Sequence, residues 1–122
     1  MADIFFSKIQ TRITPTPLAV RANNLIMTGN YEPGQQFNIH TDIGLFYDKP
    51  GRQKSNWTLL IYLNDDYEGG HTIFYDDEWK QTYDIRPEKG KALLFDIELW
   101  HRGDILLSGT KQWIGCEIIG IF

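Results

Sequence analysis

The sequence predicts a mostly β domain, either a sandwich, a barrel or a jelly roll, with only minimal helical support at its N-terminus. Two observations predict this class. Short segments rich in apolar and β-branched residues follow one another closely, and turn residues such as Pro33-Gly34 separate them. A helix-like pattern is confined to residues 2–10. A chain of 122 residues fits one domain, which we expect to span residues 1–122 with its core over about 24–122.

Strands are expected wherever such a segment lies between two turns. We place them near residues 24–31, 36–42, 57–63, 71–75, 80–85, 91–96, 98–107 (bent at Gly103) and 111–121.

One segment interrupts this spacing. Residues 43–56 form a long connection that contains Pro50-Gly51 and three basic side chains. A loop of this length in a small domain is more often functional than not, so the segment is a candidate lid. Its basic residues favour an acidic partner.

Composition excludes several function classes. The chain carries 12 basic and 16 acidic residues, a net charge of −4, which argues against general binding to nucleic acid or to an anionic membrane. The single cysteine, Cys116, rules out an intrachain disulfide and a Cys-rich zinc site. The N-terminal apolar run is short for a signal peptide and no stretch is long enough to cross a bilayer, so we expect a cytoplasmic protein.

His40 and Asp42 are the first candidates for chemistry. Two residues apart on a strand, they project from the same face. One carboxylate and one imidazole, joined by a second imidazole from elsewhere, form the facial triad that binds non-haem Fe(II) and leaves positions open. Taken alone, however, the pair is more often a hydrogen-bonded surface pair.

The surrounding residues resemble a known family. Tyr31, Gly34, His40 and Asp42 have the spacing of the Tyr-x-x-Gly-x5-His-x-Asp segment of the prolyl 4-hydroxylase-like 2-oxoglutarate oxygenases. Later motifs resemble the same family in the same order, over about four fifths of the chain: Thr58–Asn64, Glu68–Thr72, Lys89–Phe95, Trp100-His101, and Lys111 preceded by Gly109.

The resemblance implies roles for individual residues. His101 completes the metal triad, whereas His71 occupies a position where the family more usually carries glutamate and is not expected to be a ligand. Lys111 supplies a buried cation, and Tyr62 a hydroxyl, for the far carboxylate of 2-oxoglutarate. Two further candidate contacts are Tyr31, with less support, and Trp113, for which plain core packing is an equal alternative.

The implied cofactors are Fe(II), 2-oxoglutarate and O2, with ascorbate as an optional addition. The implied reaction hydroxylates an unactivated C–H bond and releases succinate and CO2. A lysine rather than an arginine partner favours a prolyl residue in a peptide or protein as substrate, and Asp42 argues against halogenation. Two alternatives stay open: a hydroxylase of a free amino acid or other small molecule, and a non-catalytic jelly-roll binding module.

Geometry then constrains the fold. If residues 101–107 and 111–117 formed a plain hairpin, Lys111 would lie ~20 Å along the strand from His101, too far for one small ligand to span. The chain must therefore cross between sheets after residue 107, as in a jelly roll (double-stranded β-helix). Only 39 residues precede His40, so part of the larger sheet could stay uncovered, which makes a homodimer a further expectation.

Overall fold

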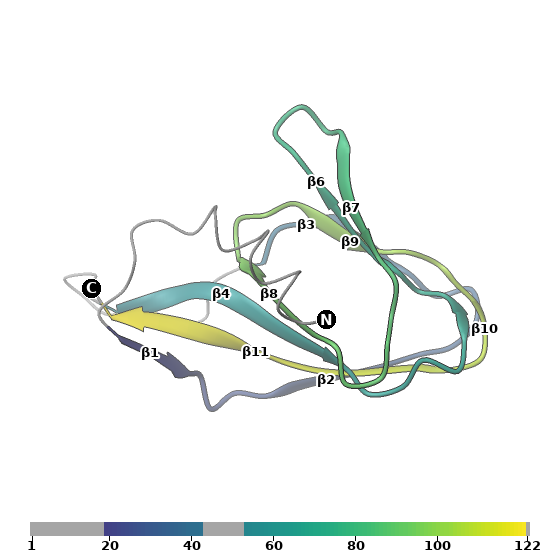
Figure 1. Ribbon diagram of the computed structural model, residues 1–122, viewed down its shortest axis with the longest axis horizontal. Helices are drawn as coiled ribbons and strands as arrows, with labels where there is room; N and C mark the ends of the chain where they lie inside the picture. The colour runs from purple at the N-terminus through teal and green to yellow at the C-terminus, as the bar shows by residue number, and fades with distance from the viewer. Residues whose placement is uncertain (1–18, 43–52, 122) are drawn as a thin grey trace.

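The protein is a sandwich of antiparallel sheets without a helix in the part described, residues 19–42 and 53–121 of a computed structural model (Figure 1). Its strands are β1 (Ala19–Ala22), β2 (Met27–Tyr31), β3 (Phe37–His40), β4 (Gln53–Tyr62), β5 (Glu68–Gly69), β6 (Thr72–Tyr75), β7 (Gln81–Ile85), β8 (Ala92–Asp96), β9 (His101–Gly103), β10 (Leu106–Ser108) and β11 (Lys111–Ile121).

Two sheets carry the architecture. In the larger sheet, β11 pairs with both β1 and β2 on one side and with β4 on the other, and β8 pairs with β4. The smaller sheet has the order β3-β9-β6-β7. A short β10–β5 ladder lies beside them at one end of the molecule (Figure 1).

The core joins the two sheets. Strand β8 alternates buried and half-buried residues, as expected for a strand with one face inward. Its Leu93 and Phe95 pack with Tyr62 of β4 and with Phe74 of the smaller sheet, and all four side chains are at most 1% exposed. Each such burial contributes roughly 1.5–3 kcal/mol of hydrophobic stabilisation. The Phe74 and Phe95 rings meet edge to face at 5.0 Å, so this contact holds the sheets together.

The chain crosses from the smaller sheet to the larger sheet between β9 and β11, as the sequence predicted. β9 pairs with β3 and β6 of the smaller sheet, β10 pairs with β5, and β11 enters the larger sheet. The predicted segment 98–107 is therefore two strands, separated at Asp104–Ile105. The jelly-roll prediction is confirmed, and a plain hairpin between residues 101–107 and 111–117 is excluded.

Some boundaries differ from the expectation. β4 begins at Gln53, so residues 53–56 belong to a strand and not to the predicted loop. The first residues of β4 show no apolar alternation, so the sequence pattern did not indicate a strand there. Ser55, for example, is buried with a hydrogen bond to Glu117 and not through apolar packing. The rest of the proposed lid, residues 43–52, and the helix-like segment 2–10 lie outside the described residues. The single domain over residues 1–122 stays a prediction.

No helix in the described ranges has the length and apolar character needed to span a bilayer.

Candidate metal centre

Two histidines and an aspartate converge at one end of the smaller sheet. The β3–β9 register places His40 opposite His101, and their ring centroids are 4.2 Å apart. Asp42 follows β3 and directs Oδ1 to 3.4 Å from Nε2 of His40 and 3.5 Å from Nε2 of His101. The ligand atoms of all three residues lie within 4.8 Å of one another. The sequence predicted that His40 and Asp42 lie on one strand. The fold brings His101, which is 59 positions after Asp42, next to them.

Backbone carbonyls fix the orientation of both imidazoles. Nδ1 of His40 lies 2.6 Å from the Asn38 carbonyl oxygen, and Nδ1 of His101 lies 2.8 Å from the Leu99 carbonyl oxygen. A neutral imidazole that donates from Nδ1 leaves its Nε2 lone pair free, which is the usual arrangement of a metal-ligating histidine. Both free nitrogens point toward Asp42.

The carboxylate is oriented in the same manner. Oγ1 of Thr58, on β4 of the larger sheet, donates to Oδ2 of Asp42 at 2.5 Å. The Asp42 backbone N–H donates to the Ile97 carbonyl oxygen at 2.8 Å. One carboxylate oxygen is thereby engaged, and the other faces the histidines. The sequence did not single out Thr58, because a threonine in a strand has an ordinary β propensity and no motif marks it.

The electrostatics of His101 and Asp42 suit a cation bound by neutral imidazole and ionised carboxylate. His101 is only 7% exposed, and burial lowers its pKa although Asp42 partly offsets the effect. Burial would raise the pKa of Asp42, but the hydrogen bond from His40 and the nearby His101 outweigh it and hold that pKa below its ordinary value. For His40, burial lowers the pKa, while Asp42 and the Asn38 carbonyl outweigh burial and raise it.

These three residues fit an Fe(II) ion by their chemistry. The donor set combines two imidazole nitrogens with one hard oxygen, the 2-His-1-carboxylate combination typical of non-haem Fe(II) sites. It is the one group of three potential ligands found in the described part of the chain. Three ligands would leave positions for other molecules, whereas a purely structural site is closed.

A buried lysine faces the core from the larger sheet. Lys111 is 3% exposed, and its Nζ donates to the Gly70 carbonyl oxygen at 2.8 Å. The ammonium lies 5.2 Å from the Tyr31 ring centroid and 5.7 Å from that of Tyr62, close enough for cation–π attraction. Burial lowers the pKa of Lys111 to about 8, against a smaller opposing effect of Asp104.

The other residues predicted to contact 2-oxoglutarate lie on the same face of the larger sheet as Lys111. β11 pairs Lys111 with Tyr31 and Trp113 with both Gly29 and Tyr62, and residues directly opposite in a ladder project to the same side. The Tyr62 hydroxyl hydrogen-bonds with Oγ1 of Thr72, a buried partner that the sequence did not reveal. The structure therefore brings the four predicted side chains together.

Trp113 occupies space that a glycine leaves free. A Cβ at Gly29 would come within 1.9 Å of its indole Nε1. Burial raises the pKa of Tyr31, and a hydrogen bond with the Trp113 side chain partly offsets this. Trp113, which is half-buried, thus contacts Tyr31 and covers Gly29.

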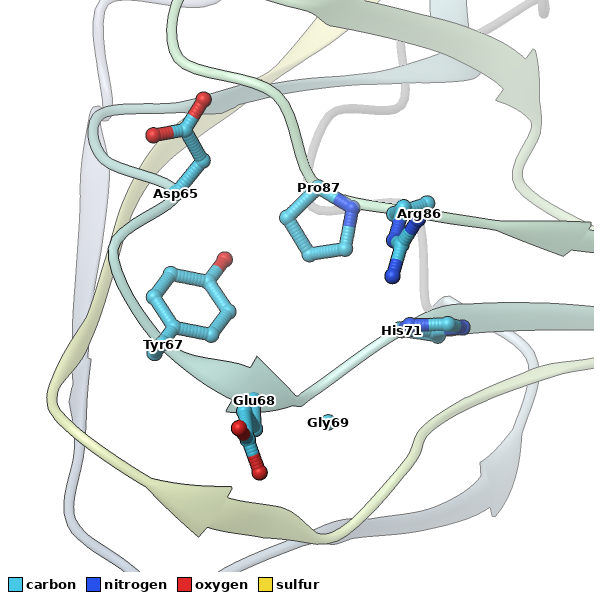
Figure 2. A pocket seen from close by; sticks show the side chains of 7 residues that line it. All are labelled: Asp65, Tyr67, Glu68, Gly69, His71, Arg86 and Pro87. Atoms are coloured by element: carbon cyan, nitrogen blue, oxygen red, sulfur yellow. The ribbon is translucent and has the colours of Figure 1, made fainter.

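His71 lies apart from the triad. Its Nδ1 is 2.6 Å from Oδ1 of Asp84, and it lines a separate hollow of about 240 Å³. The lining residues (Figure 2) include neither the triad nor the Lys111 face: Asp65, Tyr67, Glu68, Gly69, His71, Arg86 and Pro87. The Tyr67 hydroxyl points between Asp65 and Pro87 and has no hydrogen-bond partner among the residues that the structure describes.

Known proteins are similar to this chain in sequence. Residues 26–115 match the model of the 2OG-Fe(II) oxygenase superfamily. The chain is 37% identical over 83 residues to probable prolyl 4-hydroxylase 6 of Arabidopsis thaliana, covering 54% of this chain and 28% of that protein. It is 32% identical over 108 residues to probable prolyl 4-hydroxylase 3 of the same plant, covering 74% and 36%. It therefore spans about a third of the length of these relatives.

Solved structures agree on the fold. The viral collagen prolyl hydroxylase of Paramecium Bursaria Chlorella virus-1 superposes with a TM-score of 0.62 at 22% identity, covering 98% of this chain and 69% of that one. A cupin domain from Bordetella pertussis superposes with a TM-score of 0.51 at 12% identity, covering 85% and 94%. From the match over residues 26–115, the chain belongs to the 2OG-Fe(II) oxygenase superfamily.

Proposed function

We propose that the protein is an Fe(II)- and 2-oxoglutarate-dependent hydroxylase that acts on a prolyl residue of a peptide or protein. One observation carries the proposal: the Nε2 atoms of His40 and His101 and Oδ1 of Asp42 converge, within 4.8 Å of one another, on the inner side of a fold that also buries Lys111.

Each residue has a defined part in this proposal. His40, Asp42 and His101 would hold the iron, and Thr58 keeps Oδ2 of Asp42 occupied. When bound, Fe(II) would supply the activation of O2 that no side chain can provide.

The far end of 2-oxoglutarate carries a carboxylate that requires a cation when it is buried. Lys111 meets this need, and the Tyr62 hydroxyl is a hydrogen-bond donor beside it. Tyr31 and Trp113 close the same face.

Proline as the substrate rests on the relatives. The two Arabidopsis proteins are described as probable prolyl 4-hydroxylases, and one structural neighbour, from Trichoplax adhaerens, is a prolyl hydroxylase in complex with a peptide fragment. Ascorbate binding and the cytoplasmic location stay predictions.

The test is O2-dependent formation of succinate with proline-containing peptides, with free L-proline in parallel. We expect turnover with a peptide and a mass increase of one oxygen atom on it. His101→Ala should reduce turnover at least a hundredfold, because the metal loses a ligand. Turnover of free amino acids alone would instead support the small-molecule alternative.

Binding without turnover is a separate outcome. Anaerobic titration with Fe(II) and 2-oxoglutarate should produce a weak visible charge-transfer band, which requires the keto acid to chelate the metal. A band in the absence of any substrate turnover would leave the metal centre intact and contradict only the choice of substrate. A missing band in a folded protein would favour the non-catalytic module.

A further inference from the structure

Two exposed tryptophans meet at the end of the smaller sheet at which His101 lies. Trp79 is 56% exposed and Trp100 is 36% exposed, yet their ring centroids are only 4.9 Å apart at an interplanar angle of 51°. Trp79 lies in the turn between β6 and β7, a hairpin that projects from the body of the molecule (Figure 1). Trp100 directly precedes His101. The Tyr75 N–H donates to the Trp100 carbonyl oxygen at 2.9 Å and fixes the hairpin to this position.

The hairpin turn presents Trp79 in an unfavourable backbone conformation. Its φ is 63°, and among the described residues it is the one non-glycine residue with a positive φ. The Trp79 N–H donates to the Asp76 carbonyl oxygen, and the Asp76 N–H donates to that of Lys80. Such a turn favours glycine at this position. Because the side chain is more than half exposed, burial does not explain the tryptophan. Strain of this kind is more often found where it serves a function.

The pair lies at the same end of the smaller sheet as the candidate metal centre. The register of β6 and β9 pairs Phe74 with His101, and the Tyr75 N–H donates to the Trp100 carbonyl oxygen. The turn that carries Trp79 therefore extends past the end of the sheet at which His101 lies. Along an extended peptide, residues follow one another at ~3.3 Å per position, so those that flank a target entering from this end would pass near the two indoles.

The surroundings of the pair are acidic. Lys80 is the one basic residue of the hairpin turn, and Glu78 approaches its ammonium at 3.5 Å. Arg102 is occupied by Tyr75 and Asp104. Apart from Glu78, four carboxylates are close in sequence to the two tryptophans: Asp76 and Asp96, which also accept N–H groups of their own turns, and Asp77 and Glu98.

We infer that Trp79 and Trp100 form a docking site for a lysine or arginine that flanks the target residue of the peptide substrate. Aromatic faces attract cations, and the nearby carboxylates add to this attraction. The inference rests on the proposed function, since it assumes a peptide substrate, and it deepens that function by naming a feature of the peptide.

The experiment compares three peptides that carry one proline flanked by lysine, glutamine or glutamate. With the wild-type protein, we expect the lowest KM for the lysine peptide and the highest for the glutamate peptide. Trp79→Gly and Trp100→Ala should raise KM for the lysine peptide about five- to thirtyfold, with little change in kcat or in the KM for 2-oxoglutarate. The control is Leu107→Ala, which removes a residue that is 62% exposed on β10.

Trp79→Gly is expected to fold normally, because glycine readily adopts the positive φ of this turn. A change in KM therefore reports the loss of the indole and not misfolding. A lysine-peptide KM that stays within twofold of wild type in both tryptophan variants would overturn the inference. A preference for the glutamine peptide would do so as well, since it would indicate apolar docking only.

Peptide binding followed by tryptophan fluorescence separates the two proposals. If no peptide is hydroxylated, tight lysine-peptide binding that Trp79→Gly abolishes still supports the docking site, and only the proposed function fails. If peptides are hydroxylated but binding is independent of their charge, the docking site fails and the proposed function stands.

Discussion

Thr58 shows how a residue outside any motif supports the metal centre. Its hydroxyl donates to Oδ2 of Asp42 at 2.5 Å from a strand of the opposite sheet. Partners of this kind typically contribute ten- to a hundredfold to metal affinity. We expect Thr58→Val, which keeps the side-chain shape, to weaken Fe(II) binding by about that factor in an anaerobic titration. Thr28→Val, at an exposed position on β2, is the control. Unchanged affinity in Thr58→Val would show that Asp42 needs no such partner.

Lys111 makes 2-oxoglutarate binding dependent on pH. Burial lowers its pKa to about 8, and a bound carboxylate would favour the charged form. Affinity should therefore be constant below pH 8 and fall as the pH rises above it, by roughly ten- to thirtyfold between pH 7 and 9.5. Calorimetry with Mn(II) in place of Fe(II) measures this.

Two further results follow for Lys111. Lys111→Arg stays charged throughout this range, so any affinity that it retains should be independent of pH. In the protein without ligand, the lowered pKa means that the unfolded chain binds more protons between pH 8 and 10.5. The lysine's destabilising effect is therefore full below pH 8 and diminishes as the pH rises to 10.5.

Single residues were predictable to different extents. His40, Asp42, His101, Tyr62 and Lys111 were proposed because family spacing marks them. The structure brings the first three together, although Asp42 lies just after β3 and not on the strand predicted to reach it. The hydroxyls that support them could not be proposed, since no spacing rule links a strand threonine to a carboxylate 16 positions earlier.

At the scale of the element, β2 and β11 depend on one close contact. A Cβ at Gly29 would overlap the Trp113 indole, so Gly29→Ala should destabilise the protein by about 1–3 kcal/mol in urea unfolding. In a Trp113→Leu background the same change should cost under about 1 kcal/mol, because the indole is gone. Equal costs in both backgrounds would contradict the contact.

The sequence predicted strands where apolar and polar residues alternate, and it missed strands that lack this alternation. β1 and the start of β4 are such cases, because backbone pairing with β11 holds them. Among the described strands, the two-residue β5 pairs with β10 alone, and no local sequence signal specifies a partner so far along the chain.

At the scale of the whole molecule, 2-oxoglutarate would connect the two sheets. The triad lies at the end of the smaller sheet, while Lys111 and Tyr62 belong to the larger one. Metal and 2-oxoglutarate together, each at a hundred times its dissociation constant, should raise the thermal midpoint by roughly 20 °C. 2-Oxoglutarate alone should have little effect, and Asp42→Ala should lose the combined effect. A large shift with 2-oxoglutarate but no metal would mean that it binds elsewhere.

The outer face of the larger sheet bears on the predicted homodimer, which stays a prediction. It contains an apolar hollow of about 160 Å³ lined by Ile26, Leu59, Ile61, Ile114, Gly115 and Cys116. The sequence indicated that such a surface would exist, but pairing between copies depends on a partner that one chain cannot specify.

The central position of β11 determines when this protein can fold during synthesis. β11 contacts β1, β2 and β4, and it is translated after every other described strand. At a translation rate of about 5–20 residues per second, the earlier strands are synthesised several seconds before β11. During that time they lack the strand with which they pair. Such unpaired edges invite aggregation, so nascent chains of this protein should depend on chaperones until residue 121 has emerged.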